Sequence, residues 1–322
     1  MNIVEQSTDI INIVKKSSTV FIMGHRDLDL DAISSCIAFD FYAKYLNKKS
    51  YIIIDDKKNE VGVKKVLDSC SKNIKLIRSK EIEKYKKENS LLVILDTSKP
   101  ILLQNPDTLS EFENILNIDH HDKTKESLKA TLSVIDDEAS SACEMISLFL
   151  KENEIKINSS LATLLLSGII LDTNYFRLKA DADTFYMAYY LSKCGGKVTD
   201  VNELLKQNLK DYIKRQKIIS SVKVIKNIAI GRGRQRSEYK KEELAKTADS
   251  LLTFDKIKAS FVIAKIDKDL IGISGRSYGE INIGKILERF GGGGNEYEGA
   301  ARIENSNVNK VIDELSKIIR SL

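Results

Sequence analysis

A chain of 322 residues is long enough for two domains with a substantial core. Its 42% hydrophobic and 30% charged residues exclude a disordered chain, and no stretch of about 18 apolar residues predicts a membrane-spanning helix. The net charge of +5, from 51 basic and 46 acidic residues, is too small for a duplex-DNA-binding protein but suits a small polyanionic ligand. Four scattered cysteines without C-x-x-C spacing predict reduced thiols in a cytoplasmic protein.

Short apolar runs alternate with helical patterns through the first part of the chain. Strands are expected at Thr19–Met23, Ser50–Ile54, Lys75–Ile77, Leu91–Leu95 and Ile115–Ile118. Helices are expected over residues 3–17, 31–46, 140–151, 159–171, 183–194 and 199–220, with a lysine-rich helix after Asp56. This alternation predicts an α/β, Rossmann-like parallel sheet whose ligand site lies beyond the carboxyl ends of the strands.

The pattern changes near Ser221 and predicts a smaller α/β domain with a mixed sheet. The expected elements are a hairpin over residues 222–230, strands Ala259–Ile266 and Leu270–Ser274, and helices over residues 240–252, 280–290 and 307–321. We therefore expect a first domain over residues 1–205, a helical linker over 206–220 and a second domain over 221–322.

The three histidines of the chain all lie close to aspartates at the ends of expected core elements. The candidate metal-site residues are His25, Asp29, Asp31, Asp96, Asp119, His120, His121 and Asp172. Each aspartate alone is equally explained as a helix cap or turn former, but their convergence on one sheet edge favours a metal site.

Carboxylates with imidazoles and no thiolate favour Mn²⁺, with Mg²⁺, Fe²⁺ or Co²⁺ as alternatives. Six ligands exceed the needs of one catalytic ion, so we expect two ions about 3.5–4 Å apart, joined by a bridging carboxylate. Such a pair hydrolyses phosphate esters or anhydrides.

A candidate anion site follows in the C-terminal part. Consecutive glycines let backbone N–H groups approach an anion, and a guanidinium binds phosphate through two hydrogen bonds. The structural alternative for the glycines is a helix C-cap, and the basic loop 232–236 is better explained as a solvated loop. The candidate anion-binding residues are Arg276, Ser277, Gly291, Gly292, Gly293 and Gly294.

These segments together resemble the motifs of the DHH phosphoesterase superfamily. G-H-R-D-L-D-L-D-A (24–32), L-D-T (95–97), I-D-H-H (118–121) and I-L-D-T (170–173) resemble its catalytic motifs. G-R-S-Y-G-E-I-N (275–282) and G-G-G-G-N (291–295) resemble its DHH-associated C-terminal domain. Within the superfamily the chain is most similar to bacterial cyclic-di-AMP phosphodiesterases.

The resemblance implies a DHH catalytic domain, a nucleotide-gripping domain, an active site in the cleft between them, two Mn²⁺ ions and a homodimer. One ion would be bound by His25 and Asp29, the other by Asp31, His120 and Asp172, with Asp96 as the bridge. Asp119 would support His120 from the outer sphere, and His121 would act on the scissile phosphate as a hydrogen-bond donor or general acid.

Arg276, Ser277 and the four glycines would hold the distal nucleotide. Asn295 occupies the position of a family histidine, so we expect phosphate binding there to be weakened or retuned.

The resemblance favours a Mn²⁺-dependent phosphodiesterase that hydrolyses cyclic di-AMP to pApA, and pApA onward to AMP. The alternative is an exonuclease acting on short oligoribonucleotides or 3′,5′-bisphosphoadenosine, which would share the metal site. A pyrophosphatase is less favoured, because the glycine-rich signature is typical of nucleotide binding. A non-catalytic nucleotide sensor, suggested by Asn295, is disfavoured by the complete ligand set. The chain is expected to be a stand-alone enzyme or the catalytic part of a larger membrane protein.

Overall fold

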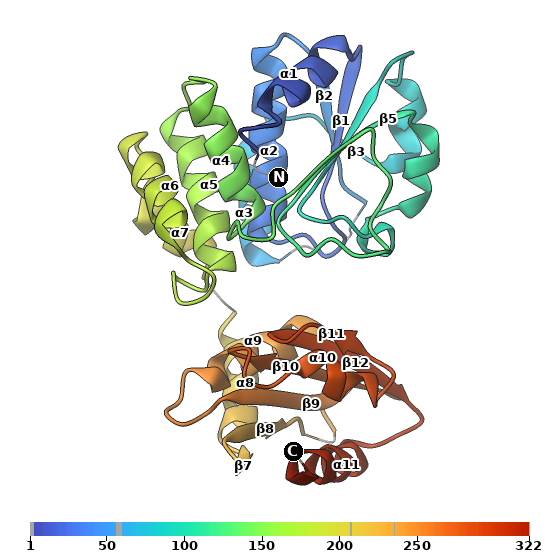
Figure 1. Ribbon diagram of the computed structural model, residues 1–322, viewed down its shortest axis with the longest axis vertical. Coiled ribbons are helices and arrows are strands. Elements are labelled where there is room, and N and C mark those ends of the chain that lie inside the picture. Colours follow the sequence, from blue (N-terminus) through green and yellow to red (C-terminus); the bar gives the residue numbers. More distant parts are fainter. Residues whose placement is uncertain (1–2, 56–59, 207, 235, 322) are drawn as a thin grey trace. The chain divides into compact units, whose positions relative to one another are not determined.

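The computed structural model describes residues 3–55, 60–206, 208–234 and 236–321 (Figure 1). The chain divides into two compact units, Met1–Lys206 and Gln207–Leu322. Each unit has its own sheet and its own buried core. Two residues named in the sequence patterns, Asp56 and Gln235, lie outside the described residues.

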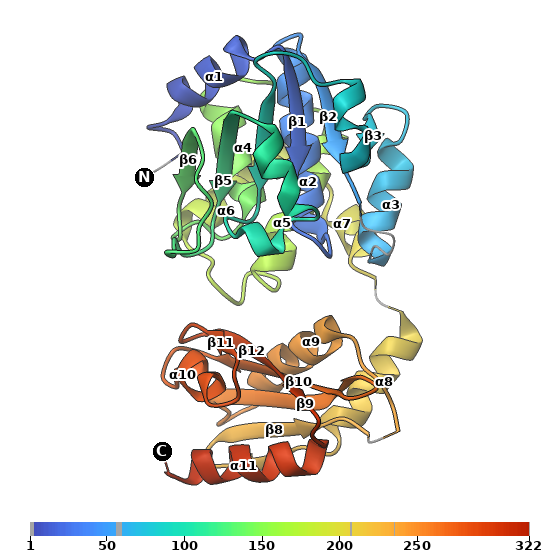
Figure 2. The same cartoon turned by 90° about the vertical axis from the view of Figure 1, so that its right-hand side faces the viewer.

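The first unit is built around a parallel sheet whose strands are β1 (Thr19–Met23), β2 (Lys49–Ile53), β3 (Leu76–Ile77), β4 (Leu91–Leu95), β5 (Asn114–Asp119) and β6 (Leu132–Ile135). Their order is β3-β2-β1-β4-β5-β6, with β3 and β6 at opposite edges (Figure 2). All residues of β1 and β4 are buried, as expected for central parallel strands that are covered on both faces.

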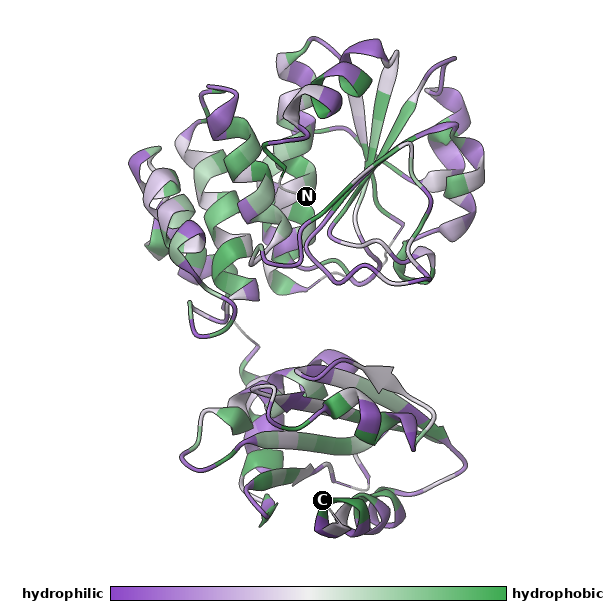
Figure 3. Cartoon of the chain, viewed as in Figure 1, coloured by the Kyte–Doolittle hydropathy of each residue, from purple (hydrophilic) through white to green (hydrophobic). Residues whose placement is uncertain are grey.

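The helices of this unit are α1 (Ser7–Lys16), α2 (Leu30–Tyr45), α3 (Val61–Cys70), α4 (Ala142–Glu152), α5 (Ser159–Asp172), α6 (Ala182–Lys193) and α7 (Val198–Leu204). Alternate strand residues, such as Ile22 and Val93, share one core cluster with α2, α4 and α5. The intervening strand residues, such as Phe21 and Ile94, pack on the other face with Ile82 of the 3₁₀-helix Ser79–Lys84. Helix α5 is apolar over nearly its whole surface (Figure 3), which is typical of a helix buried on every side, and most residues of α2 are also buried.

The order of the parallel strands reverses between β1 and β4. The chain runs outward from β1 through β2 to β3 and then returns to β4 on the other side of β1. At such a reversal the loops leave the carboxyl edge in opposite directions and open a crevice that ligands occupy. The loops after β1, β4 and β5 begin at this edge, and they carry His25, Asp96 and His120.

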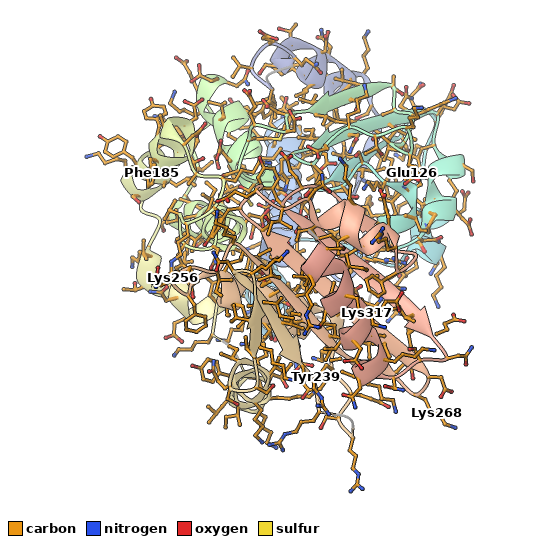
Figure 4. The ribbon with its side chains drawn as sticks, turned by 60° about the horizontal axis from the view of Figure 1, so that its bottom comes forward. Glu126, Phe185, Tyr239, Lys256, Lys268 and Lys317 are labelled. Atoms are coloured by element: carbon orange, nitrogen blue, oxygen red, sulfur yellow. The ribbon has the colours of Figure 1, made fainter. Side chains whose placement is uncertain are left out.

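The second unit is built on a mixed sheet of β7 (Lys223–Ile225), β8 (Ile228–Arg232), β9 (Ala259–Asp267), β10 (Leu270–Ser277), β11 (Gly293–Gly294) and β12 (Glu298–Glu304). Their order is β11-β12-β10-β9-β8-β7, with β8 and β9 parallel and the other pairs antiparallel. Helices α8 (Leu209–Ile219) and α9 (Lys241–Leu252) cover one face, and α10 (Ile283–Glu288) and α11 (Val308–Ser321) cover the other (Figure 2). The β9–β10 hairpin turns at Lys268, which is labelled in Figure 4.

The expected α/β class, with a Rossmann-like parallel sheet and a second mixed sheet, is confirmed. The sequence did not predict β6 or β12, because each has one buried residue and therefore lacks a strong apolar run.

The single helix expected over residues 199–220 is wrong. The region contains two helices, α7 and α8, and Asn208 caps the start of α8. Its side chain accepts a hydrogen bond from the Lys210 N–H at 2.9 Å. Ile218 of α8 packs in the second unit's core, so the expected linker contributes to that unit. In the described part of the chain, no helix is long and apolar enough to cross a lipid bilayer.

Candidate metal centre

The loop after β1 holds His25 in a fixed orientation. Gly24 passes close to α2, where a Cβ at position 24 would lie 3.2 Å from the Cβ of Ala32. His25 Nδ1 lies 2.7 Å from the carbonyl oxygen of Arg26, and because that oxygen can only accept, Nδ1 carries the proton. Nε2, the ring nitrogen left to bind a metal, then faces Asp96, whose Oδ2 is 3.3 Å away. An imidazole tied to a carbonyl through one nitrogen and free at the other is typical of a metal ligand.

Asp29 and Asp31, at the start of α2, are each anchored by backbone N–H groups. Asp29 caps the helix, with Oδ1 accepting a hydrogen bond from the Ala32 N–H at 2.9 Å, which leaves Oδ2 3.7 Å from His25 Nε2. Asp31 is fully buried and accepts hydrogen bonds from the N–H groups of Ala142 (2.7 Å) and Cys143 (2.9 Å), the first two residues of α4. Burial, reinforced by the neighbouring carboxylates, raises the pKa of Asp31 well above its usual value.

A glycine on α5 makes the space in which Asp31 lies. A Cβ at Gly168 would overlap both the Asp31 carboxylate and the Cys143 sulfur. The close packing of α2, α4 and α5 therefore depends on the absence of a side chain at position 168.

Asp96 is the centre of the cluster. It follows β4 in a left-handed backbone conformation, with φ at +62°, and it is 3% exposed. Its Oδ2 faces His25, and its Oδ1 lies 3.2 Å from His120 Nε2, so one carboxylate reaches two imidazoles. Burial alone would raise the pKa of Asp96, but the contacts with His120 and His25 hold it well below its usual value.

The three residues at the end of β5 make different contacts: His120 faces the aspartate cluster, and Asp119 contacts His121. His120 is 6% exposed, and its Nε2 lies 3.2 Å from Asp172 Oδ2. Asp119 is fully buried, and its Oδ1 accepts hydrogen bonds from the backbone N–H (3.3 Å) and ring Nδ1 (2.8 Å) of His121. The expectation that Asp119 supports His120 is therefore wrong. The chain turns directly after β5, and in this Asx-type turn the Asp119 carboxylate meets the residue two positions ahead, which pairs Asp119 with His121.

In the absence of a cation, bound protons have to balance the negative charge of this cluster. Burial lowers the pKa of both His25 and His120. For His25 this effect is outweighed by Asp29 and Asp96, and for His120 by Asp172 and Asp96, so both pKa values are well above the usual value. Burial also raises the pKa of Asp172, the last residue of α5, to about 6. Imidazoles and carboxyls that retain protons in this way are responding to an excess of buried negative charge.

The side chains fit divalent cations. They form three overlapping groups in which one ligand atom from each residue lies within 4.8 Å of the others. Among the described residues, buried Asp96 Oδ1 and both ring nitrogens of His120 lack a hydrogen-bond partner, a gap that a cation would fill. Four carboxylates also match the charge of two divalent ions. The groups are His25, Asp29 and Asp96; Asp31, Asp96, His120 and Asp172; and Asp96, His120 and His121.

All eight metal-site residues expected from the sequence therefore lie together, six of them in two groups that share Asp96. The sequence missed Lys179, whose Nζ donates a hydrogen bond to the carbonyl oxygen of His120 at 3.1 Å. It also missed the α4 N–H groups that bind Asp31. No local pattern marks either contact, because both join segments that are far apart in the chain.

In the second unit, two carboxylates hold the Arg276 guanidinium. Nε donates to Asp249 Oδ1 at 2.8 Å, and the other side of the guanidinium lies 3.2 Å from Glu298 Oε2. Burial raises the pKa of Asp249 although Arg276 opposes the shift. Asp249 and Glu298 were not expected from the sequence, because neither is close to Arg276 along the chain. Arg276 is thus oriented and largely neutralised before any ligand binds.

The other expected anion-binding residues also have structural partners. Ser277 is buried, and its Oγ accepts a hydrogen bond from the Gly279 N–H at 3.0 Å. The N–H groups of Gly291 and Gly292 donate to carbonyls of α10 and its C-cap region, as in a helix C-cap, while Gly293 and Gly294 pair with β12. The expectation of successive free N–H groups is therefore wrong for Gly291 and Gly292.

Asn295 closes the turn between β11 and β12. Its Oδ1 accepts hydrogen bonds from the N–H groups of Tyr297 and Glu298, both at 2.8 Å. This Asx-type turn leaves the amide nitrogen as the part of the side chain that is available to a ligand.

Comparisons with known proteins agree with this organisation. Residues 19–169 match the N-terminal domain of the DHH family, and residues 217–321 match the DHHA1 domain. A cyclic-di-AMP phosphodiesterase, GdpP of Geobacillus thermodenitrificans, is 32% identical over 95% of this chain and 48% of its own length. The chain spans about half the length of the curated relatives it matches.

Two solved structures share the fold. An exopolyphosphatase-related protein from Bacteroides fragilis has a TM-score of 0.80 at 18% identity, covering 98% of this chain and 97% of its own. RecJ from Thermus thermophilus, in complex with Mn²⁺, has a TM-score of 0.58 at 11% identity, covering 99% of this chain and 55% of its own.

Asp96→Asn is expected to weaken Mn²⁺ binding at both positions, because the two groups share this carboxylate. Asparagine tolerates left-handed backbone, so the change removes charge without adding strain. We expect the loss in isothermal titration calorimetry to exceed the about 10- to 100-fold typical of an outer-sphere partner. Asp55→Asn is the control, since Asp55 also follows a strand of this sheet but accepts the Ser79 N–H instead. Wild-type affinity in Asp96→Asn would contradict the shared-ligand arrangement.

The metal-free protein is expected to lose stability as the pH rises. Asp172, with a pKa near 6 in the folded protein against 3.8 ordinarily, favours folding when protonated, so its contribution falls between about pH 4 and 6. The raised pKa values of His25 and His120 have the same sign, because their contribution is present below 6.5 and is lost as pH rises through the folded values. For Asp172 alone, the shift from 3.8 to about 6 corresponds to on the order of 3 kcal/mol.

Thermal melts in a chelator, between about pH 4 and 8, would measure this slope. Mn²⁺ should reverse it, because metal ligands bind in their deprotonated forms. Asp172→Asn should flatten the acidic part of the curve. A midpoint that rises with pH in the chelator would contradict the assignment.

Proposed function

The chain belongs to the DHH family, and we propose that it is a Mn²⁺-dependent phosphodiesterase that hydrolyses cyclic di-AMP to pApA, and pApA onward to AMP. The observation that carries the proposal is the Asp96 carboxylate, whose two oxygens face two separate groups of ligands. That arrangement suits two cations acting on one phosphate.

In this proposal His25 and Asp29 would hold one ion, Asp31, His120 and Asp172 would hold the other, and Asp96 would be shared between them. When bound, two divalent ions activate a water molecule and hold the phosphoryl oxygens. The imidazole and carboxylate donors suit Mn²⁺, with Mg²⁺ or Co²⁺ as substitutes. The lack of a thiolate among these ligands is what disfavours a soft-metal site.

His121 is proposed as the general acid. Its Nδ1–H is held by buried Asp119, which directs Nε2 away from that carboxylate, and the side chain is 53% exposed. Although burial opposes it, the contact with Asp119 raises the pKa of His121, so the imidazolium is available near neutral pH. A protonated His121 would donate its Nε2 proton to the leaving ribose oxygen and return to the neutral state.

Arg276 is proposed to bind the distal nucleotide. Asp249 and Glu298 offset its charge, so its contribution is directional hydrogen bonding more than net attraction. Because these carboxylates fix the guanidinium, less conformational entropy is lost when a phosphate or a base binds. Ser277 and the glycines 291–294 would then shape the backbone around Arg276, and Asn295 would offer its amide N–H.

The sequence similarity to the cyclic-di-AMP phosphodiesterase supports the substrate, and the second family domain supports a nucleotide over free pyrophosphate. The alternative is an exonuclease for short linear oligoribonucleotides or 3′,5′-bisphosphoadenosine. It would have the same metal centre, and the second unit would bind a different nucleotide.

A substrate panel distinguishes these functions. With Mn²⁺, wild-type protein is expected to convert cyclic di-AMP to pApA, which chromatography of the products would detect. Wild-type protein in a chelator and the Asp96→Asn variant should both be inactive. Loss of the bridging carboxylate should reduce turnover by at least about 10³-fold. Hydrolysis of linear di- to pentanucleotides but not of cyclic di-AMP would support the exonuclease function instead. Tight binding of cyclic di-AMP without hydrolysis would support a non-catalytic nucleotide sensor.

Asn295→Asp tests the distal nucleotide site. Aspartate keeps the oxygen that accepts the Tyr297 and Glu298 N–H groups, but it replaces the amide donor with a negative charge. KM for the nucleotide should rise about 10-fold or more through lost donation and repulsion, with Mn²⁺ affinity and melting temperature unchanged. Asn295→His should also alter KM, and it should lower the melting temperature because the turn loses its acceptor. An unchanged KM in both variants would show that position 295 does not contact substrate.

A further inference from the structure

The backbone at Asp96 is strained and must be held in place. A φ of +62° is uncommon for residues with a Cβ, although aspartate adopts it more readily than most, and Asp96 takes it directly after the extended strand β4. Its own N–H donates to the carbonyl oxygen of Ile118 at 3.0 Å, which fixes only one side of the turn. Because the carboxylate must reach two imidazoles at once, a small rotation of this turn would break one of the two contacts.

Asn117 fixes the turn from the neighbouring strand. It lies on β5 opposite Ile94 and is completely buried. Its Nδ2 donates one hydrogen bond to the carbonyl oxygen of Ile94 at 3.3 Å and another to that of Thr97 at 2.8 Å. These two carbonyls flank Asp96 along the chain, so one side-chain amide joins the residues on both sides of the strained position.

Asn117 is an unusual choice for packing alone. On its face of the sheet the neighbouring positions, such as Leu92, Ile94 and Ile115, are apolar and belong to one core cluster. A buried amide in such surroundings is unfavourable unless its hydrogen bonds are made, and Oδ1 of Asn117 has no hydrogen-bond partner among the described residues. The two bonds from Nδ2 are therefore the feature that distinguishes asparagine from an apolar residue of similar size.

We infer that Asn117 is a positioning residue that sets the location of the shared carboxylate of the metal centre. The inference rests on the proposed function, since it takes Asp96 as the bridging ligand. Asn117 touches neither substrate nor metal in this assignment and acts only through the backbone of residues 94–97. Because Asp96 belongs to both groups, losing Asn117 should weaken both ions together, whereas loss of a ligand from one group should weaken one ion more than the other.

The test measures Mn²⁺ binding directly on the full chain. Metal-free wild type, Asn117→Leu and Asn117→Ser are titrated with Mn²⁺ by calorimetry, and their melting temperatures are measured in a chelator. Leucine matches the size of asparagine without its donors, and serine is a smaller change that is easier for the fold to accept. We expect both Mn²⁺ affinities to fall by about 10- to 100-fold, the range for loss of a residue that orients a metal ligand.

Asn153→Leu is the matched control. Asn153 lies in the same unit, and its Nδ2 donates to the backbone carbonyl oxygen of Phe149 at 2.7 Å, away from the metal centre. It should lower the melting temperature in the chelator while its Mn²⁺ affinities stay at the wild-type values. Wild-type Mn²⁺ affinities in a folded Asn117 variant, or a loss confined to one ion, would overturn the inference. Failure of the wild type to bind Mn²⁺ would instead overturn the proposed function.

Discussion

Repulsion among closely spaced carboxylates is the constraint on which the first unit's architecture depends. Asp29, Asp31, Asp96 and Asp172 converge at one edge of the sheet, and two of them are almost fully buried. At such separations and low dielectric, like charges repel by several kcal/mol. The fold resists this repulsion with N–H groups at the ends of α2 and α4, a strained turn after β4 and a glycine that lets α5 approach. The cations of the proposed centre would remove the repulsion that remains.

Local contacts, not the cations, set the positions of these ligands. Asp29 is a helix cap, Asp31 is bound by another helix, and His25 is tied to a carbonyl. Asp29 and His25 therefore each keep one atom for structure and offer another to a ligand, whereas both Asp31 oxygens accept a backbone N–H and would bind a cation through their remaining lone pairs. A site arranged in this way loses little conformational entropy when ions bind, which favours tight and geometrically selective binding.

The sequence was sufficient to predict strands β1 to β5 of the first unit's sheet and the residues that meet at its edge. Apolar runs such as Leu91–Leu95 end abruptly in charged residues, and parallel strands bring such ends together. It was insufficient where tertiary contacts decide. β12 is mostly exposed, so its pairing with β10 leaves no apolar pattern, and the partner of Asp119 depended on side-chain direction at one strand end. The carboxylates around Arg276 and the capping role of Gly291 and Gly292 also involve residues whose proximity is set by the fold.

The ligand groups draw on nearly the whole length of the first unit, from His25 in its first loop to Asp172 at the end of α5. During synthesis the early ligands emerge long before the last one, so a complete centre can form only after β1, β4, β5 and α5 have all been made. Capture of the proposed ions would thus be a late event that follows assembly of the sheet, and it would report completion of the unit. A chain interrupted before α5 would retain His25, Asp29 and Asp96 but lack the helix that encloses Asp31, and so would expose a partial site to the wrong ions.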